Sequence, residues 1–143
     1  MTAKAYLQQI YWLHSNIIKK SQQLDELRAD TIGYKAIDYA ADKVQSTPTD
    51  RMANVVGRYT DLENIVRSMI DEYYYKKDFI INQIIEMDDA RYRDILHARY
   101  VEFKSLKKIA HEMRYEYKWV CALHGRALTA FADKYLNNTT KHD

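Results

Sequence analysis

SLKKIAHEMRYEYKWVCALHGRALTAF, residues 105–131, is the stretch whose apolar spacing decides the fold. Two apolar runs at helical spacing flank a turn-sized segment, Arg114 to Tyr117, and the small Ala110 lies where two crossing helices would touch. Ser105 is a good N-cap for the first run. The residues expected to face inward are Ile109, Met113, Val120, Leu123, Ala127, Leu128 and Phe131. The stretch therefore predicts a helix-turn-helix.

A supporting helix is expected immediately upstream, from Ala90 to Phe103. Asp88 and Asp89 can cap it, because a carboxylate oxygen accepts from the free N–H groups of a first helical turn. Its inward residues would be Tyr92, Ile95, Leu96, Tyr100 and Phe103.

A helix of about 38 residues is predicted to begin at Pro48, with Thr47 as its cap and Asp50 in its first turn. Heptad spacing continues along it, with Lys76 and Gln83 at polar seam positions. Such a helix would be roughly 57 Å long, so it needs partners. The seam residues expected to mediate oligomerisation are Tyr59, Leu62, Val66, Met69, Tyr73, Ile80 and Ile84.

The first helix is predicted from about Ala3 to Arg28, again with heptad spacing. Residues 32–45 include Gly33 and have mixed polarity, which predicts a loop containing a single helical turn. The whole chain should be all-α. A long-helix hairpin or coiled-coil-like bundle would occupy residues 1–87, a helix-turn-helix domain residues 88–136, and a disordered tail residues 137–143.

The composition agrees with this reading. In 143 residues there are 3 Gly and 1 Pro, too few for the turns of a sheet protein. A single Cys, no leader and no apolar run near 18 residues indicate a cytoplasmic chain that does not cross a membrane. Residues 91–131 carry nine Lys and Arg against four Asp and Glu, the sign that suits a phosphate backbone.

The face of the second helix opposite its apolar residues would meet DNA. The candidates for reading bases are Tyr117, Lys118, Cys121 and Ala122, and those for phosphate contacts are Lys104, Lys107, Lys108, Arg114 and Arg126. The alternative is that these are ordinary surface residues on a domain that binds DNA weakly. We find no catalytic constellation: His111-Glu112 lacks the second His of a zinc protease helix, and Cys121 has no partner. We therefore expect a non-enzyme without metal or cofactor.

Residues 105–131 resemble region 4 of the sigma-70 class of RNA polymerase subunits. The resemblance rests on the Ser-Leu-Lys-x-Ile-Ala opening, on Val120 and Leu123, and on the close Arg126-Ala127-Leu128. With Arg99-Tyr100-Val101 and the run DKVQSTPTDRMANVV at 42–56, the chain is similar to short sigma-region-4-like regulators of Gram-positive prophages. Two positions depart from that pattern. Arg114 stands where Gly is usual, and Glu116 where Ser or Thr is usual; a left-handed Arg114 would cost roughly 1 kcal/mol relative to Gly.

The resemblance implies a phage or prophage activator of late transcription in the bacterial host cytoplasm. Its implied partners are double-stranded DNA and host RNA polymerase, and the long helix adds a second copy of the chain, as a homodimer or higher homo-oligomer. One alternative is a small terminase-like subunit for phage DNA packaging. Another is a structural coiled-coil adaptor that does not bind DNA.

Overall fold

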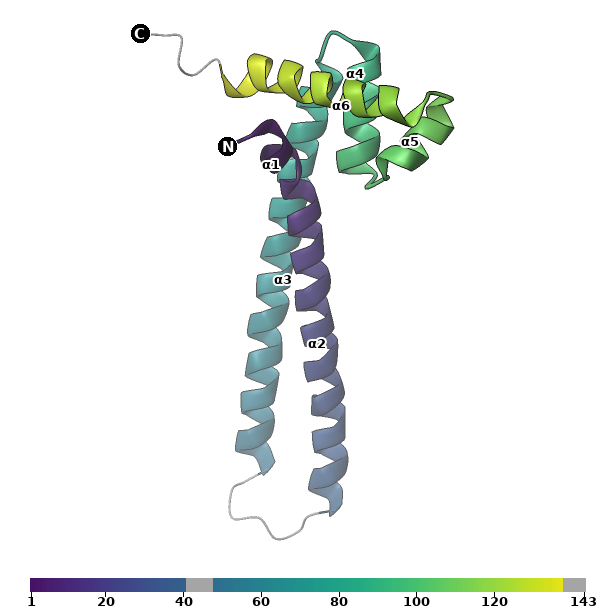
Figure 1. Cartoon of the computed structure of the whole chain (residues 1–143). Coiled ribbons are helices and arrows are strands. Elements are labelled where there is room, and N and C mark those ends of the chain that lie inside the picture. Colours follow the sequence, from purple (N-terminus) through teal and green to yellow (C-terminus); the bar gives the residue numbers. More distant parts are fainter. Residues whose placement is uncertain (41–47, 138–143) are drawn as a thin grey trace, which may run out of the picture. The chain divides into compact units, whose positions relative to one another are not determined.

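The computed structural model describes residues 1–40 and 48–137, and every element in that part of the chain is helical (Figure 1). Only the backbone is described for residues 31–40 and 48–49. The elements are α1 (Ala3–Leu7), α2 (Gln9–Ala40), α3 (Pro48–Ile85), α4 (Ala90–Leu96), η1 (His97–Val101), α5 (Leu106–Met113), α6 (Tyr117–Phe131) and η2 (Ala132–Leu136), where η1 and η2 are short π-helical segments. The predicted all-α class is confirmed.

The chain forms two compact units. Unit 1 comprises residues 1–13 and 73–143, and unit 2 comprises residues 14–72. The first 13 residues thus belong with the C-terminal half of the chain. The boundaries between the units lie after residues 13 and 72, whereas the sequence predicted one boundary after residue 87.

Unit 2 contains most of α2 and the first part of α3. The prediction that the first helix ends near Arg28 is wrong, because α2 continues to Ala40. Gly33 costs a helix only about 1 kcal/mol relative to Ala, so it does not end α2 by itself. Helix α3 begins at Pro48 and has 38 residues, as predicted. The expected cap Thr47 and the rest of 41–47 lie outside the described residues.

The heptad seam of α3 is used inside a single chain. Five of the seven residues expected to mediate oligomerisation are buried there, and Tyr59 and Met69 are partly buried: the five are Leu62, Val66, Tyr73, Ile80 and Ile84. These five positions are therefore covered within the chain, and their role in oligomerisation stays a prediction. Within unit 1, the polar positions of the seam bond the N-terminal segment: the Tyr6 hydroxyl donates to Gln83 Oε1 at 2.7 Å, and Lys76 Nζ donates to Gln9 Oε1 at 3.4 Å.

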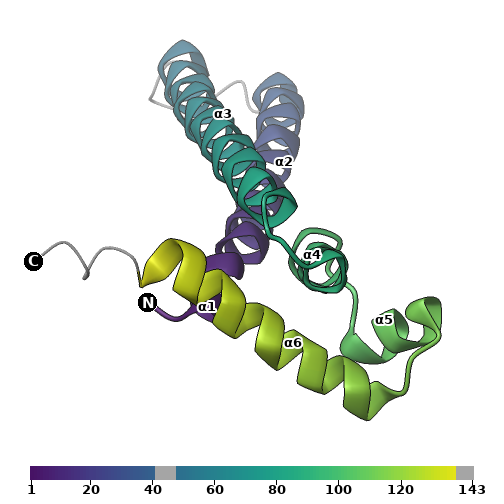
Figure 2. The same ribbon diagram turned by 90° about the horizontal axis from the view of Figure 1, so that it is seen from above.

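In unit 1, α1, α4 and α5 pack against α6. Figures 1 and 2 show α4 and α5 beside its first half and α1 beside its second half. The ring of Tyr6 in α1 lies 5.7 Å from that of Phe131, which is fully buried. The Tyr135 hydroxyl donates to the Gln83 carbonyl at 2.6 Å, and Lys134 donates to the Glu86 carbonyl, so η2 is fastened to the end of α3.

The supporting helix is less regular than expected. It starts as predicted, with the Asp89 carboxylate accepting from the Arg91 N–H at 2.8 Å. After Leu96 it widens into the π-helical η1, in which the Glu102 N–H donates to the His97 carbonyl five residues back. η1 ends at Val101, and two residues later Phe103 adopts a left-handed backbone conformation with φ 59°.

Within residues 1–40 and 48–137, no helix combines the length and the apolar character needed to cross a lipid bilayer.

Candidate nucleic-acid interface

The first helix of the interface, α5, has defined caps at both ends. At its start, Ser105 Oγ accepts from the Lys108 N–H at 3.2 Å, as predicted. At its end, Arg114 has φ 58° and ψ 40°, the left-handed conformation that glycine usually supplies. The Tyr115 N–H then donates to the Ala110 carbonyl at 3.0 Å. Residues 114–116 connect α5 to α6, a turn one residue shorter than expected.

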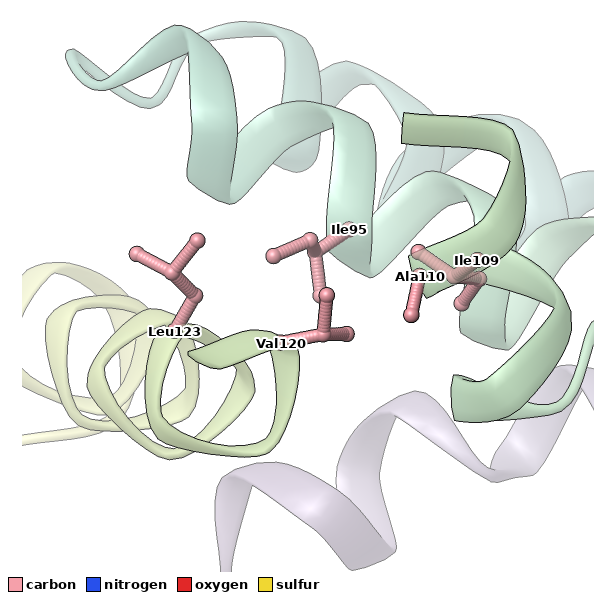
Figure 3. Close-up of a cluster of buried hydrophobic side chains, with 5 residues drawn as sticks. All are labelled: Ile95, Ile109, Ala110, Val120 and Leu123. Atoms are coloured by element: carbon pink, nitrogen blue, oxygen red, sulfur yellow. The ribbon is translucent and has the colours of Figure 1, made fainter. Parts of the chain in front are cut away.

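The two helices share a core with α4. Figure 3 shows the side chains that converge there, Ile95, Ile109, Ala110, Val120 and Leu123. Tyr92, Ala98, Leu106 and Met113 pack around them, partly buried. Ala110 is buried in this cluster, as expected for a small residue at a helix crossing. Leu128, expected inside, is only partly buried.

The opposite face of α6 is open to solvent. Of the four base-reading candidates, Lys118 and Ala122 are exposed, Tyr117 is 47% exposed and Cys121 is partly buried. Gly125 continues this face, and a Cβ added to it would meet no atom within 4 Å. Since Ala122 and Gly125 are small, the α6 backbone itself could come close to a groove.

The five phosphate candidates differ in their availability. Lys107, Lys108, Arg114 and Arg126 are exposed. Lys104 is partly buried, and its Nζ lies 2.7 Å from a Glu102 oxygen and 2.8 Å from a Glu112 oxygen. The hydrogen bonds that Lys104 donates to Glu102 and Glu112 raise its pKa, so Lys104 holds its proton but already has two anionic partners. Lys104 is therefore the weakest of the five candidates.

Two aromatic rings position cations at the start of α6. Lys107 Nζ lies 5.9 Å from the centre of the Tyr117 ring, and the Arg126 guanidinium lies 5.3 Å from that of Trp119, which is 36% exposed. The Cys121 thiol beside the Tyr117 hydroxyl raises the pKa of Tyr117. A tyrosine hydroxyl is protonated at neutral pH and can donate a hydrogen bond.

A histidine on the inner side of α6 was not singled out from the sequence. The Tyr100 hydroxyl and His124 Nε2 are 2.8 Å apart, and their rings stack. Burial lowers the pKa of His124, and the positive charges of Arg99 and Lys4 lower it further. Its position beside Leu123, on the core flank of α6, is the only sequence signal that could have indicated this contact.

Neither a metal centre nor a related protein indicates another function. In the part of the chain that the structure describes, no group of three His, Cys, Asp or Glu residues could hold a metal ion. Comparison with protein-family models, curated proteins and solved structures finds no match.

Proposed function

We propose that residues 105–131 act as a helix-turn-helix that binds double-stranded DNA. The observation that carries this proposal is the two-sided character of α6. Val120, Leu123 and Ala127 are fully buried, whereas the opposite side presents Lys118, small residues and a margin of exposed cations. A helix that packs against the protein on one side and is exposed on the opposite side suits insertion into a major groove.

The exposed residues would make two kinds of contact, with phosphates and with bases. Lys107 and Lys108 lie in α5, Arg114 lies in the turn before α6, and the Arg126 guanidinium lies over the Trp119 ring. These exposed cations would contact phosphates, which fix register without reading sequence. Lys118 can reach guanine, and the Ala122 methyl group can touch thymine. Lys118 is the only cationic side chain among the four base-reading candidates, so affinity would depend more on phosphates than on bases.

The sequence resemblance extends this proposal to a biological role. A sigma-region-4-like unit would place the chain among phage or prophage regulators, as an activator of late genes that contacts promoter DNA and RNA polymerase. The arrangement of a helical N-terminal half followed by a helix-turn-helix belongs to the same proposal.

A salt titration of DNA binding tests the proposal. Binding of the full chain to duplex DNA should weaken steeply with rising salt, because each neutralised phosphate releases about 0.9 counterion. Lys107→Ala with Lys108→Ala should lower affinity on all sequences alike and reduce the salt slope by roughly two. The matched control is Lys19→Ala with Arg28→Ala, which removes the same charge from exposed positions of unit 2. No binding at low salt would leave the structural adaptor as the function.

Two single variants refine the assignment. Lys118→Ala should change the preference among DNA sites selected from the host genome, whereas Lys104→Ala should cost less affinity than Lys107→Ala because Lys104 is already paired. Equal small losses on every sequence for both variants would contradict the role given to Lys118, and equal losses for Lys104→Ala and Lys107→Ala would contradict the weaker role given to Lys104.

A further inference from the structure

Helix α3 carries a second apolar face besides its buried seam. Four residues define this side stripe: Ile70, Tyr74, Ile81 and Ile85. At about 100° per residue they lie within about 60° of one another and about 100° away from the seam at Tyr73 and Ile80. Tyr74 is 56% exposed and Ile85 60% exposed, while Ile70 and Ile81 are partly buried. The side stripe is thus apolar surface that its own chain leaves largely uncovered.

The spacing between successive residues of the side stripe is the same when the helix is read in either direction. If a second α3 lies antiparallel to the first, with a two-fold axis between Lys77 and Asp78, Ile70 faces Ile85 and Tyr74 faces Ile81. The same register places Lys77 opposite Asp78, twice. Apolar residues therefore meet apolar residues, and opposite charges meet at the centre.

We propose that the side stripe binds the side stripe of a second copy of this chain, in this antiparallel register. The interface differs from the predicted one, since the heptad seam is occupied within each chain. It also does not depend on DNA binding.

Charge complementarity identifies the occupant. A parallel pair would bring Lys77 onto Lys77 and Asp78 onto Asp78, whereas the antiparallel pair joins each Lys to an Asp. Asp78 is exposed, and no ion pair or hydrogen bond of its side chain occurs within residues 1–40 and 48–137. Lys77 is partly buried, and its Nζ lies 5.4 Å from the centre of the Tyr73 ring, on the seam side of the helix.

Equilibrium sedimentation of the full chain with charge-reversed variants tests this interface. The wild type should dimerise in the micromolar range. Lys77→Asp and Asp78→Lys should each raise the dissociation constant at least about tenfold, because like charges then meet twice. The double variant K77D/D78K restores the opposite-charge pairs and should return the dissociation constant to within about threefold of the wild type. A monomeric wild type, or single variants without effect, would overturn the proposal.

Matched controls separate this face from others. Tyr75→Ser and Phe79→Ser remove exposed aromatic rings from another side of α3 and should leave dimerisation unchanged. In a Cys121→Ser background, Ile70→Cys with Ile85→Cys should form an oxidised covalent dimer, and Ile70→Cys alone should not. Cross-linking by Ile70→Cys alone would show a parallel pair, and dissociation caused by Phe79→Ser would show a different face. Either result contradicts the register proposed.

Discussion

The two units of the molecule bury their apolar residues in different ways. In unit 1, side chains from α1, α2, α3, α4, α5 and α6 are fully enclosed, whereas among the described side chains of unit 2 only Leu62 and Val66 are buried. Unit 2 follows heptad spacing, yet a seam between two helices leaves each apolar residue with one open flank. Unit 1 encloses its residues from several directions. Regular spacing is therefore a poor guide to burial.

This difference predicts unequal local stability. Amide hydrogens of α6 should exchange only through large-scale opening, while those of the unit 2 helices should exchange through smaller local openings. The variants below test this contrast, beginning with the one expected to have the largest effect.

Leu123→Ala should lower the free energy of unfolding by about 2–5 kcal/mol, because the rigid cluster around Leu123 would retain a cavity. Leu62→Ala is the matched variant in unit 2. The expected loss in the free energy of unfolding is smaller, close to the about 1.5–3 kcal/mol for transferring the side chain out of water. A seam between two helices can close over the missing atoms, so no cavity contribution is added. Urea unfolding with hydrogen exchange resolved by segment measures both losses. Equal losses of unfolding free energy, with faster hydrogen exchange throughout both units in each variant, would contradict the predicted difference in local stability between the units.

Acidification should weaken unit 1 selectively through His124. The pKa of His124 lies below its ordinary value of 6.5, so below pH 6.5 the unfolded chain binds the proton more readily than the folded one. Stability should be complete above pH 6.5 and decline as pH falls toward the folded pKa, by at most about 1.4 kcal/mol per pH unit. His124→Gln should flatten this decline in thermal unfolding curves recorded from pH 7.5 to 5. The exposed His111→Gln should not, and an unchanged slope in His124→Gln would contradict the assignment.

Arg114→Gly should stabilise unit 1 by about 1 kcal/mol, because Gly adopts the left-handed conformation without strain. Phe103→Gly relieves similar strain but removes a ring that meets Tyr11 edge-on at 5.6 Å, so it should give no net gain. Urea midpoints compare the two. In the DNA assay, Arg114→Gly should also weaken binding, and Arg114→Lys should largely retain it. If Phe103→Gly stabilised the protein and Arg114→Gly did not, both expectations would be contradicted.

The sequence predicted best those features that depend on neighbouring residues. Pro48 and the length of α3, the Ser105 cap, and the inward residues Ile109, Val120 and Leu123 all follow from spacing and capping chemistry within one helix. The resemblance marked Arg114 as a position where Gly is usual, but the left-handed conformation of Arg114 was not predicted, because nothing in Arg itself favours it.

Features that depend on distant residues were not predictable in this way. Periodicity shows which side of a helix is apolar but not which element covers it, so the packing of Tyr6 on Phe131 was missed. The widening of the supporting helix at His97 has no local signal either. At the candidate site, the exposed face of α6 was foreseen, but the pairing of Lys104 required coordinates.

The smallest expected effects come from two helical glycines, one in each unit. A Cβ added to Gly125 or to Gly57 would meet nothing within 4 Å, so Ala at either position should stabilise its helix by about 0.5–1 kcal/mol. Because the units differ in local stability, Gly57→Ala should slow hydrogen exchange around residue 57, and Gly125→Ala should raise the urea midpoint of unit 1.

DNA binding should then distinguish the two glycine variants. Gly125 lies on the face of α6 proposed to enter the groove, so its new methyl group would press against the DNA and lower affinity even as it stabilises the fold. Gly57→Ala should leave affinity unchanged. A more stable protein that binds DNA less well cannot be explained by partial unfolding, so this pair tests the groove-facing assignment separately from stability. Equal affinity in both variants would move the DNA contact away from Gly125.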